Sequence, residues 1–476
     1  MKRFSLYALA NLAFLVFITL WSDGAGLAYL CPLFALCSTA LLVERPLNGP
    51  YSILCLFLAI YFIFYGLQDT LAGTSEGGLT EPEIVILIGG ALAVLGYILA
   101  VAMTRPQIDT ADASDWRPAT VVIVGLLLWG LGSYAAWVWS VDLITDTKNT
   151  TAARALGSIS GMKTTLLMLG QMAKPLGMLM IAYAQTVYRR PYLLPILVFV
   201  VVFQLFYGFV VDIKGEAMIG VVLVLLTKVF VHARVPKAWL TVGVVFVVVA
   251  FPVFQAHRVI SGARHIDHAE TAQNLGRSIS LALEASTKES TARRRQSQNF
   301  FERASLKASV QVIVTKTGDG VEFQQGNTLT PLLATFIPKI LWRDKPDLAV
   351  GQLMNSEFHI SEFRDTYISP SHLGELYWNF GWLGVLLGMP VIGFVFGTVG
   401  ARSNLADRVS LTRLMIMVVT IRYIVMGFEG SIAVSYVVWL RSLAGIGLLH
   451  LLMERRSRHS QDELAELGQT RTVSVP

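Results

Sequence analysis

Residues 368–384 read ISPSHLGELYWNFGWLG, and they mark the point where a long polar segment ends and an apolar helix begins. An imidazole, His372, and an acid, Glu375, lie together at this boundary. Polar groups there can reach both water and the membrane surface, whereas the same groups deeper in a bilayer are costly unless they are paired. We therefore expect any chemistry of this chain to be located at this boundary.

The composition around this stretch is that of a membrane protein. Of the 476 residues, 54% are hydrophobic and only 15% are charged, and the mean hydropathy is +0.58. The net charge of +6 reflects Lys and Arg that flank apolar segments, which indicates membrane topology and argues against a nucleic-acid partner. Cys31, Cys37 and Cys55 have no metal-binding spacing, so we expect neither disulfides nor a zinc site.

Apolar windows of about 17 to 25 residues predict an all-α polytopic membrane protein with about 12 transmembrane helices. The windows are residues 6–21, 26–43, 51–71, 84–103, 121–141, 164–187, 193–211, 217–231, 239–254, 376–399, 411–427 and 432–453. Lys and Arg concentrate in alternate loops, which predicts that both termini are cytoplasmic.

This topology divides the chain into four parts. The first nine helices lie in residues 1–256, a large extracytoplasmic (periplasmic) loop spans 257–371, the last three helices lie in 372–453, and 454–476 form a cytoplasmic tail that we expect to be disordered. A loop above a hundred residues is too long for a connector, so at least part of it should be ordered.

Two segments of this loop show helical or interfacial patterns. Phe301, Ala304, Ala308 and Val312 recur at helical spacing and predict a packed helix face. The apolar residues 329–341 predict a short helix at the membrane surface, where nearby cations can reach phosphates; these are Lys339, Arg343 and Lys345.

Several further cations lie within or beside the apolar windows. Lys214, Arg258 and Arg422 fall at a similar outer depth and predict a basic, outward-facing cavity suited to a diphosphate headgroup. Lys174, before a helix-breaking Pro175, and Arg441 lie near the middle of their windows. These two are either functional or buried cations paired with a carbonyl or a distant acid.

Other charged residues of the loop carry less specific signals. His265 and His268 have Asp267 and Glu270 beside them but lack a firm third ligand, so ordinary surface residues are favoured over a metal site. Arg293–Arg295 fit a solvated helix face or a contact with anionic lipid.

Four motifs of the second half resemble one known family. They are Arg303-Ala304-Ser305, residues 323–329 (FQQGNTL), residues 337–346 (IPKILWRDKP) and residues 374–381 (GELYWNFG) with Gly384. Their order, together with the many spans and one large outer loop, resembles the bacterial Wzy-type polymerases of O-antigen and exopolysaccharide, which are related to O-antigen ligases.

The resemblance implies a GT-C-like glycosyltransferase of the bacterial inner membrane that needs no metal or other cofactor. The donor would be a glycan on undecaprenyl diphosphate, and a hydroxyl of a single lipid-linked repeat unit would attack its anomeric carbon. The implied partners are undecaprenyl-diphosphate-linked glycans, membrane lipids, a chain-length regulator and a flippase. Arg303 would join the diphosphate-binding cations.

The residues near the boundary have assignments with stated alternatives. Glu375, or otherwise His372, would accept the hydroxyl proton, but Glu375 is also placed to cap a helix and His372 to make a structural hydrogen bond. Tyr377, Trp378 and Asn379 would bind sugar, the alternative for the rings being an interfacial aromatic belt.

Three other functions compete with the polymerase. A ligase would use the same donor with a different acceptor, and a flippase would move the lipid-linked sugar; the intramembrane cations favour the flippase, whereas the absence of an internal repeat argues against it. A non-catalytic scaffold would not need cations at several outer positions.

Overall fold

The computed structural model describes most of the chain outside the long loop. The described residues are 2–21, 27–43, 53–72, 79–104, 118–147, 161–210, 214–232, 241, 305–333, 336–337, 341–342, 350–360, 367–402 and 410–471. Apart from one isolated bridge between Thr317 and Val321, every regular element within these ranges is a helix. The expected all-α class is confirmed for this part of the chain.

Within the described residues, six helices are long and apolar enough to cross a membrane, and the twelve expected spans are not confirmed. They are Glu81–Met103 (α6), Pro118–Trp137 (within α7, Pro118–Thr147), Leu193–Val210 (α10), Trp382–Arg402 (α20), Leu411–Glu429 (α21 and the two turns after it) and Ile432–Met453 (within α22, Ile432–Arg471).

The remaining predicted windows are helical wherever the structure describes them. Three shorter apolar regions are present, formed by α1 (Lys2–Trp21), α2 (Leu27–Ser38) with α3 (Ala40–Val43), and α4 (Ile53–Tyr65) with α5 (Leu67–Ala72). The sixth and eighth windows form α9 (Gly161–Tyr188) and α11 (Lys214–His232). The window 239–254 lies outside the described residues, except for residue 241.

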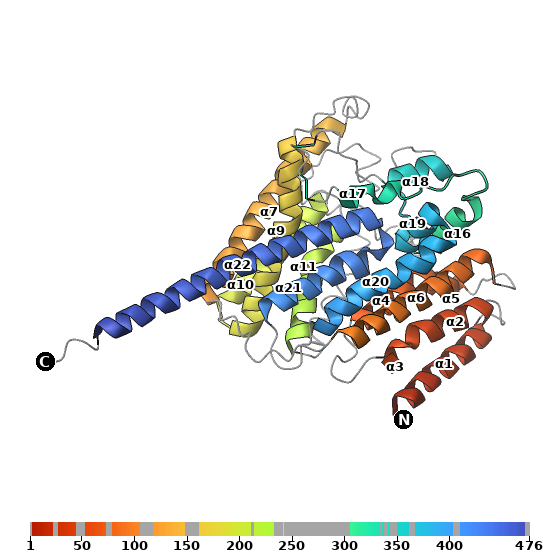
Figure 1. Cartoon of the computed structure of the whole chain (residues 1–476), viewed down its shortest axis with the longest axis horizontal. Coiled ribbons are helices and arrows are strands. Elements are labelled where there is room, and N and C mark those ends of the chain that lie inside the picture. Colours follow the sequence, from red (N-terminus) through yellow and green to blue (C-terminus); the bar gives the residue numbers. More distant parts are fainter. Residues whose placement is uncertain are drawn as a thin grey trace, which may run out of the picture.

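The expected helix break at Pro175 is absent, because α9 is one continuous helix with this proline inside it. The expected disorder after residue 453 is also wrong, since α22 continues to Arg471 and extends beyond the other helices at the C-terminal end (Figure 1).

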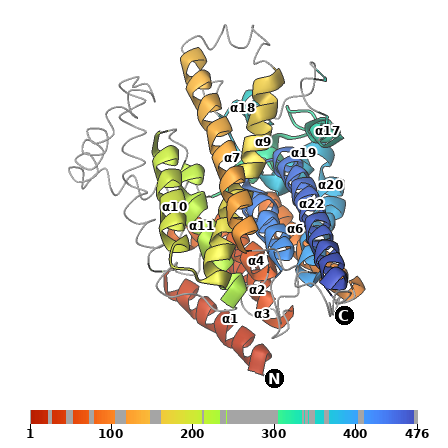
Figure 2. The ribbon, with the colours of Figure 1, turned by 90° about the vertical axis from the view of Figure 1, so that its left-hand side faces the viewer.

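Glycines allow two pairs of helices to approach closely. A Cβ at Gly393 of α20 would lie 1.9 Å from the carbonyl oxygen of Ala93 in α6, and one at Gly132 of α7 would lie 2.4 Å from the backbone nitrogen of Lys174 in α9. Small residues at such contacts are typical of membrane helices, whose association depends on tight packing. Figure 2 shows α7 and α9 side by side, with α10 and α11 next to them.

Part of the long loop is ordered against the N-terminal helices. Its helix α16 (Lys307–Lys316) contacts α19 (Ser371–Phe380), and the backbone nitrogen of Leu306 donates to the carbonyl of Phe64 at 2.9 Å. The buried face of α16 consists of Val310, Ile313 and Val314. Of the expected face, Ala308 is exposed and Val312 is half-buried against the core, whereas Phe301 and Ala304 lie outside the described residues.

The predicted surface helix over 329–341 is shorter than expected. The 3-10 turn Asn327–Leu329 (η2) and α17 (Thr330–Leu333) precede the described bend at 336–337, and Val350–Phe358 forms α18. The apolar side chains of this region are strongly exposed, with Leu333 at 89%, Phe336 at 62% and Leu341 at 77%. Such exposure is consistent with a membrane-facing surface.

Candidate functional site

The helix α19 carries the boundary motif and is fixed at both ends. It begins at Ser371, whose backbone has a φ of 58°, a conformation that costs about 1–3 kcal/mol for a non-glycine residue. The Tyr65 hydroxyl donates to Ser371 Oγ at 3.0 Å and holds this start. The helix ends at Gly381, whose φ of 60° turns the chain into α20.

Glycines beside α19 have two different roles. A Cβ at Gly384 would lie 2.1 Å from the carbonyl oxygen of Leu376, and one at Gly374 would lie 2.8 Å from the Ile313 side chain, so both glycines permit close packing. Gly381 instead supplies a turn that its positive φ requires.

The carboxyl of Glu375 is fully buried, and one of its two oxygens accepts a hydrogen bond. Its Oε2 accepts a hydrogen bond of 2.6 Å from the backbone nitrogen of Ile432, the first residue of α22. Glu375 therefore caps a helix, but that helix is α22 and not its own. A carboxylate at this position is favoured, because the N-terminus of a helix carries a partial positive charge. Its Oε1 is buried without a partner in hydrogen-bond geometry.

Burial raises the pKa of Glu375 from 4.5 to about 7, although the Ile432 amide and the nearby Thr328 hydroxyl both lower it. Removal from water penalises the ionised form, which is the dominant effect here. A carboxyl with this pKa exchanges its proton near neutral pH, the property that a general base needs.

His372 lies one helical turn before Glu375 in an aromatic environment. Its ring centroid is 5.0 Å from that of Phe428 and 5.7 Å from that of Tyr436. Both ring nitrogens are buried without a hydrogen-bond partner, and burial lowers the pKa of His372 to about 3. The imidazole is therefore neutral at neutral pH, and the structural hydrogen bond that was the alternative for it is not formed.

Asn379 connects α19 to the FQQGNTL motif. Its Nδ2 donates to Thr328 Oγ1 and to the Glu375 carbonyl, both at 2.7 Å, and its Oδ1 accepts from the Gly326 nitrogen at 2.9 Å. We call Thr328, His372, Glu375, Asn379 and the Ile432 amide the Glu375 cluster. The sequence placed the two motifs in separate segments, and the fold joins them here.

The two aromatic residues assigned to sugar binding have different surroundings. Trp378 is fully buried, with its ring centroid 5.2 Å from that of Phe358. Tyr377 is 6% exposed, and its hydroxyl lies 3.3 Å from Glu81 Oε1, which also accepts from the Trp382 indole at 3.1 Å. The assignment of Tyr377, Trp378 and Asn379 to sugar stays a prediction.

Among the cations predicted to bind diphosphate, Arg422 is the one whose side chain the structure describes. The side chain of Lys214, and all of Arg258, Arg303, Lys339, Arg343 and Lys345, lie outside the described residues, as do His265 and His268. No group of three or more metal-ligating side chains occurs in the part of the chain that the structure describes.

Arg422 lies in a π-helical turn, Ile421–Val425 (η3), which follows α21 (Leu411–Thr420) and leads into the 3-10 turn Met426–Glu429 (η4). Its NH2 is 3.7 Å from Glu216 Oε1, and Lys174 Nζ is 2.5 Å from Glu216 Oε2. We call Lys174, Gln204, Tyr207, Glu216 and Arg422 the Glu216 cluster. Lys174 thus has the acid partner that was one of its two expected roles.

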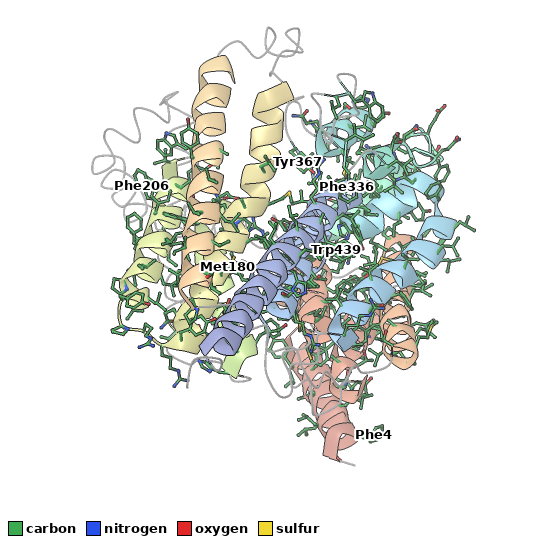
Figure 3. All side chains as sticks on the ribbon, turned by 60° about the vertical axis from the view of Figure 1, so that its left-hand side comes forward. Phe4, Met180, Phe206, Phe336, Tyr367 and Trp439 are labelled. Atoms are coloured by element: carbon green, nitrogen blue, oxygen red, sulfur yellow. The ribbon has the colours of Figure 1, made fainter. Side chains whose placement is uncertain are left out.

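The two clusters are joined by one stretch of backbone. Arg422 stands in η3, whereas Phe428 of η4 contacts His372, so residues 421–429 link both. Short π-helical turns often mark functional positions. Figure 3 shows Tyr367 and Phe336 near one end of α22, with Trp439 farther along this helix.

Sequence reasoning missed Glu216 as the centre of a cluster and missed Gln204 and Tyr207 altogether. A signal for Glu216 was present, because an acid beside an apolar window needs a partner, and Lys174 was available. Gln204 and Tyr207 gave no signal that distinguishes them from other residues of an apolar helix.

Comparisons with known proteins give a family but no activity. No curated protein and no solved structure matches this chain. One family model matches residues 140–408, more than half of the chain, and this segment includes Lys174, Glu216 and Glu375. The chain belongs to the family described as a domain of unknown function, DUF8712.

Proposed function

We propose that this protein is an integral membrane glycosyltransferase that joins undecaprenyl-diphosphate-linked repeat units into a long surface polysaccharide. One observation carries the proposal. A buried carboxyl with a pKa of about 7 lies on α19, and α19 packs against η4, the turn that directly follows the η3 arginine whose NH1 has no hydrogen-bond partner among the described residues. Transfer of a glycan from a diphosphate needs a proton acceptor and a fixed cation.

In this reaction an acceptor hydroxyl oxygen forms a bond with the anomeric carbon of the donor glycan while the bond from that carbon to the diphosphate oxygen breaks. The hydroxyl proton passes to the Glu375 carboxylate, and undecaprenyl diphosphate leaves with the bonding electrons. Arg422 stabilises the negative charge that develops on the leaving group, since its planar guanidinium can donate two hydrogen bonds to phosphate oxygens.

Access to Glu375 requires a movement, because its side chain is fully buried. We assign this movement to residues 426–431, which lie between η3 and α22 and contact α19. The backbone there is 3-10 helical and then extended, so fewer helical hydrogen bonds resist a shift.

The proposal includes the expected topology. Both termini are cytoplasmic, and residues 257–371 lie at the outer face of a bacterial inner membrane. Arg258, Arg303, Lys339, Arg343 and Lys345 then line the diphosphate site with Lys214 and Arg422. The GT-C-like architecture remains part of this proposal.

The test is the size ladder of envelope glycan from a deletion strain beside its parent. Loss of long chains, with a single repeat still transferred to its usual acceptor, supports the polymerase. An unchanged ladder contradicts it. If the single repeat is also missing, accumulation of lipid-linked glycan at the outer face indicates a ligase, and accumulation at the inner face indicates a flippase.

A further inference from the structure

Three helical elements, none of which carries Glu375, bring two cations and one acid together. Lys174 comes from α9, Glu216 from the first turn of α11 and Arg422 from η3. Lys174 Nζ lies 2.5 Å from Glu216 Oε2 and 4.3 Å from the centre of the Tyr207 ring. With two positive groups and one negative group, this set carries a formal excess of one positive charge.

The two cations are paired unequally with Glu216. Lys174 makes a short hydrogen bond, whereas Arg422 at 3.7 Å is beyond hydrogen-bond distance. The NH1 of Arg422 is buried and has no hydrogen-bond partner among the residues that the structure describes. A buried guanidinium donor without an acceptor is costly, and it indicates that an acceptor is bound in another state.

Hydrogen-bond donors surround the Glu216 carboxylate, so its position can hold an anion. Gln204 Nε2 donates to the Glu216 carbonyl at 2.5 Å and to Oε2 at 3.1 Å, so an ammonium, an amide and a guanidinium all converge on it. Phosphate oxygens accept from the same donors. The Glu216 side chain is 24% exposed and that of Lys174 only 5%, so the acid is the more accessible member of the pair.

We propose that Glu216 is a built-in counterion that holds the place of a diphosphate between Lys174 and Arg422, and that Lys174 is a phosphate-binding residue. This inference rests on the proposed function. When the diphosphate binds, Glu216 leaves the pair and phosphate oxygens accept from Lys174, Gln204 and Arg422. The carboxylate neutralises the cations while the site is empty and competes with the ligand for them.

Because Glu216 competes with the ligand for the cations, substitutions of Glu216 and of Lys174 should change the affinity for the ligand in opposite directions. Glu216→Gln removes the competing charge while its amide oxygen still accepts from Lys174, so we expect about tenfold tighter binding of undecaprenyl diphosphate. Lys174→Gln removes a phosphate ligand, and we expect at least about tenfold weaker binding. Binding is measured on the purified full-length chain in nanodiscs, with fluorescent undecaprenyl diphosphate as the probe.

The matched control is Lys228→Gln. Lys228 is also a buried lysine of this helical region, on α11, but it pairs with the neutral Gln185, whose Oε1 accepts at 2.8 Å. We expect wild-type affinity for this variant. The double variant Lys174→Gln with Glu216→Gln removes both charges, and its melting temperature and affinity separate a folding defect from a lost ligand.

The ligand source is separated by two competitors. Inorganic pyrophosphate that displaces the probe shows that the diphosphate alone is recognised. Displacement by undecaprenyl monophosphate, but not by pyrophosphate, shows that the lipid supplies the affinity and overturns the assignment of a diphosphate site.

Weaker binding by a folded Glu216→Gln variant would overturn the counterion role, because Glu216 would then only position Lys174. This result leaves the proposed function standing if the glycan ladder still depends on the protein. An unchanged ladder in the deletion strain, with opposite affinity shifts in the two variants, refutes the polymerase and retains the anion site.

Discussion

The Glu375 cluster contains a fully buried acid and the Glu216 cluster a half-buried one, and only the half-buried acid has cations beside it. Glu216 lies between Lys174 and Arg422, whereas Glu375 is held by a backbone nitrogen and has one oxygen without a partner. A carboxylate between cations stays ionised, and a carboxyl buried among neutral groups binds its proton more tightly. The difference supports our proposal that one cluster binds charge and the other exchanges a proton.

The largest effect is expected for Glu375→Gln. The amide oxygen can still accept from the Ile432 nitrogen, so the fold is kept, but the side chain no longer accepts a proton, and polymer synthesis falls by about a hundredfold or more. The measurement is polymer formed per unit of membrane-inserted protein.

The control for this variant is Glu357→Gln, an exposed acid on α18. It should synthesise polymer at the normal rate. Normal synthesis by Glu375→Gln itself would remove Glu375 as the base and leave it as the cap of α22.

The pH dependence of the protein's stability tests the raised pKa of the Glu375 carboxyl. The folded-state pKa of about 7 exceeds the usual 4.5, so the folded state binds this proton more tightly than the unfolded state. Stability from this group is therefore lost as pH rises from 4.5 to 7, by about 3 kcal/mol. Glu375→Gln should become progressively more stable than the wild type over this range.

His372 also affects stability in this range, because its lowered pKa makes the folded protein less stable as the pH falls below 6.5. Both proteins carry His372, so the difference between their melting temperatures isolates Glu375. A difference that does not change with pH would contradict the raised pKa. Polymer synthesis by the wild type should decline as pH falls below about 7, since the base is then protonated.

Glycine substitutions disturb one cluster at a time. A Cβ at Gly132 would meet the backbone nitrogen of Lys174, and one at Gly384 would meet the carbonyl oxygen of Leu376 in the helix of Glu375. Each alanine variant should lose about 1–3 kcal/mol of stability. Gly132→Ala should weaken diphosphate binding without altering the pH profile, and Gly384→Ala should alter the pH profile.

Gly130→Ala is the matched control in α7, because a Cβ there meets nothing within 4 Å. This variant should be as stable as the wild type or slightly more stable. Equal losses in Gly130→Ala and Gly132→Ala would mean that helix propensity, and not the contact with α9, determines the effect.

The smallest effect is expected for Thr328→Val, which removes the oxygen that accepts from Asn379. The loss should be about 1 kcal/mol, measured by thermal unfolding. Thr315→Val removes a hydroxyl from an exposed position on α16 and should change stability less. A loss for Thr328→Val no larger than for Thr315→Val would show that this hydrogen bond contributes little to the Glu375 cluster.

A third group of charged residues, separate from both clusters, holds part of the long loop against the N-terminal helices. Lys307 of α16 lies 2.5 Å from Asp69 Oδ2 and 2.6 Å from Glu83 Oε1. Burial lowers the pKa of Lys307, but its hydrogen bonds with Asp69 and Glu83 more than offset this and leave it raised. The sequence suggested a packed helix in this region, and the partners of Lys307 became visible only in the fold.

The sequence by itself determined the helical class and the positions of the apolar helices, because these depend on local hydropathy over about 20 residues. It also marked Glu375, Arg422 and Lys174, since charges beside apolar windows are rare. Six long spans are found among the described residues, and the apolar windows alone do not show how α9 and α11 cross a membrane.

Only the tertiary structure decided which charges meet. Lys174 and Glu216 are 42 residues apart, and Glu375 and Ile432 are 57 apart, so no local pattern links them. The alternative role of Glu375 was to cap its own helix, but the helix that it caps is α22. The physical reason is that the pKa and partner of a buried acid depend on the helices packed around it and not on its neighbours in sequence.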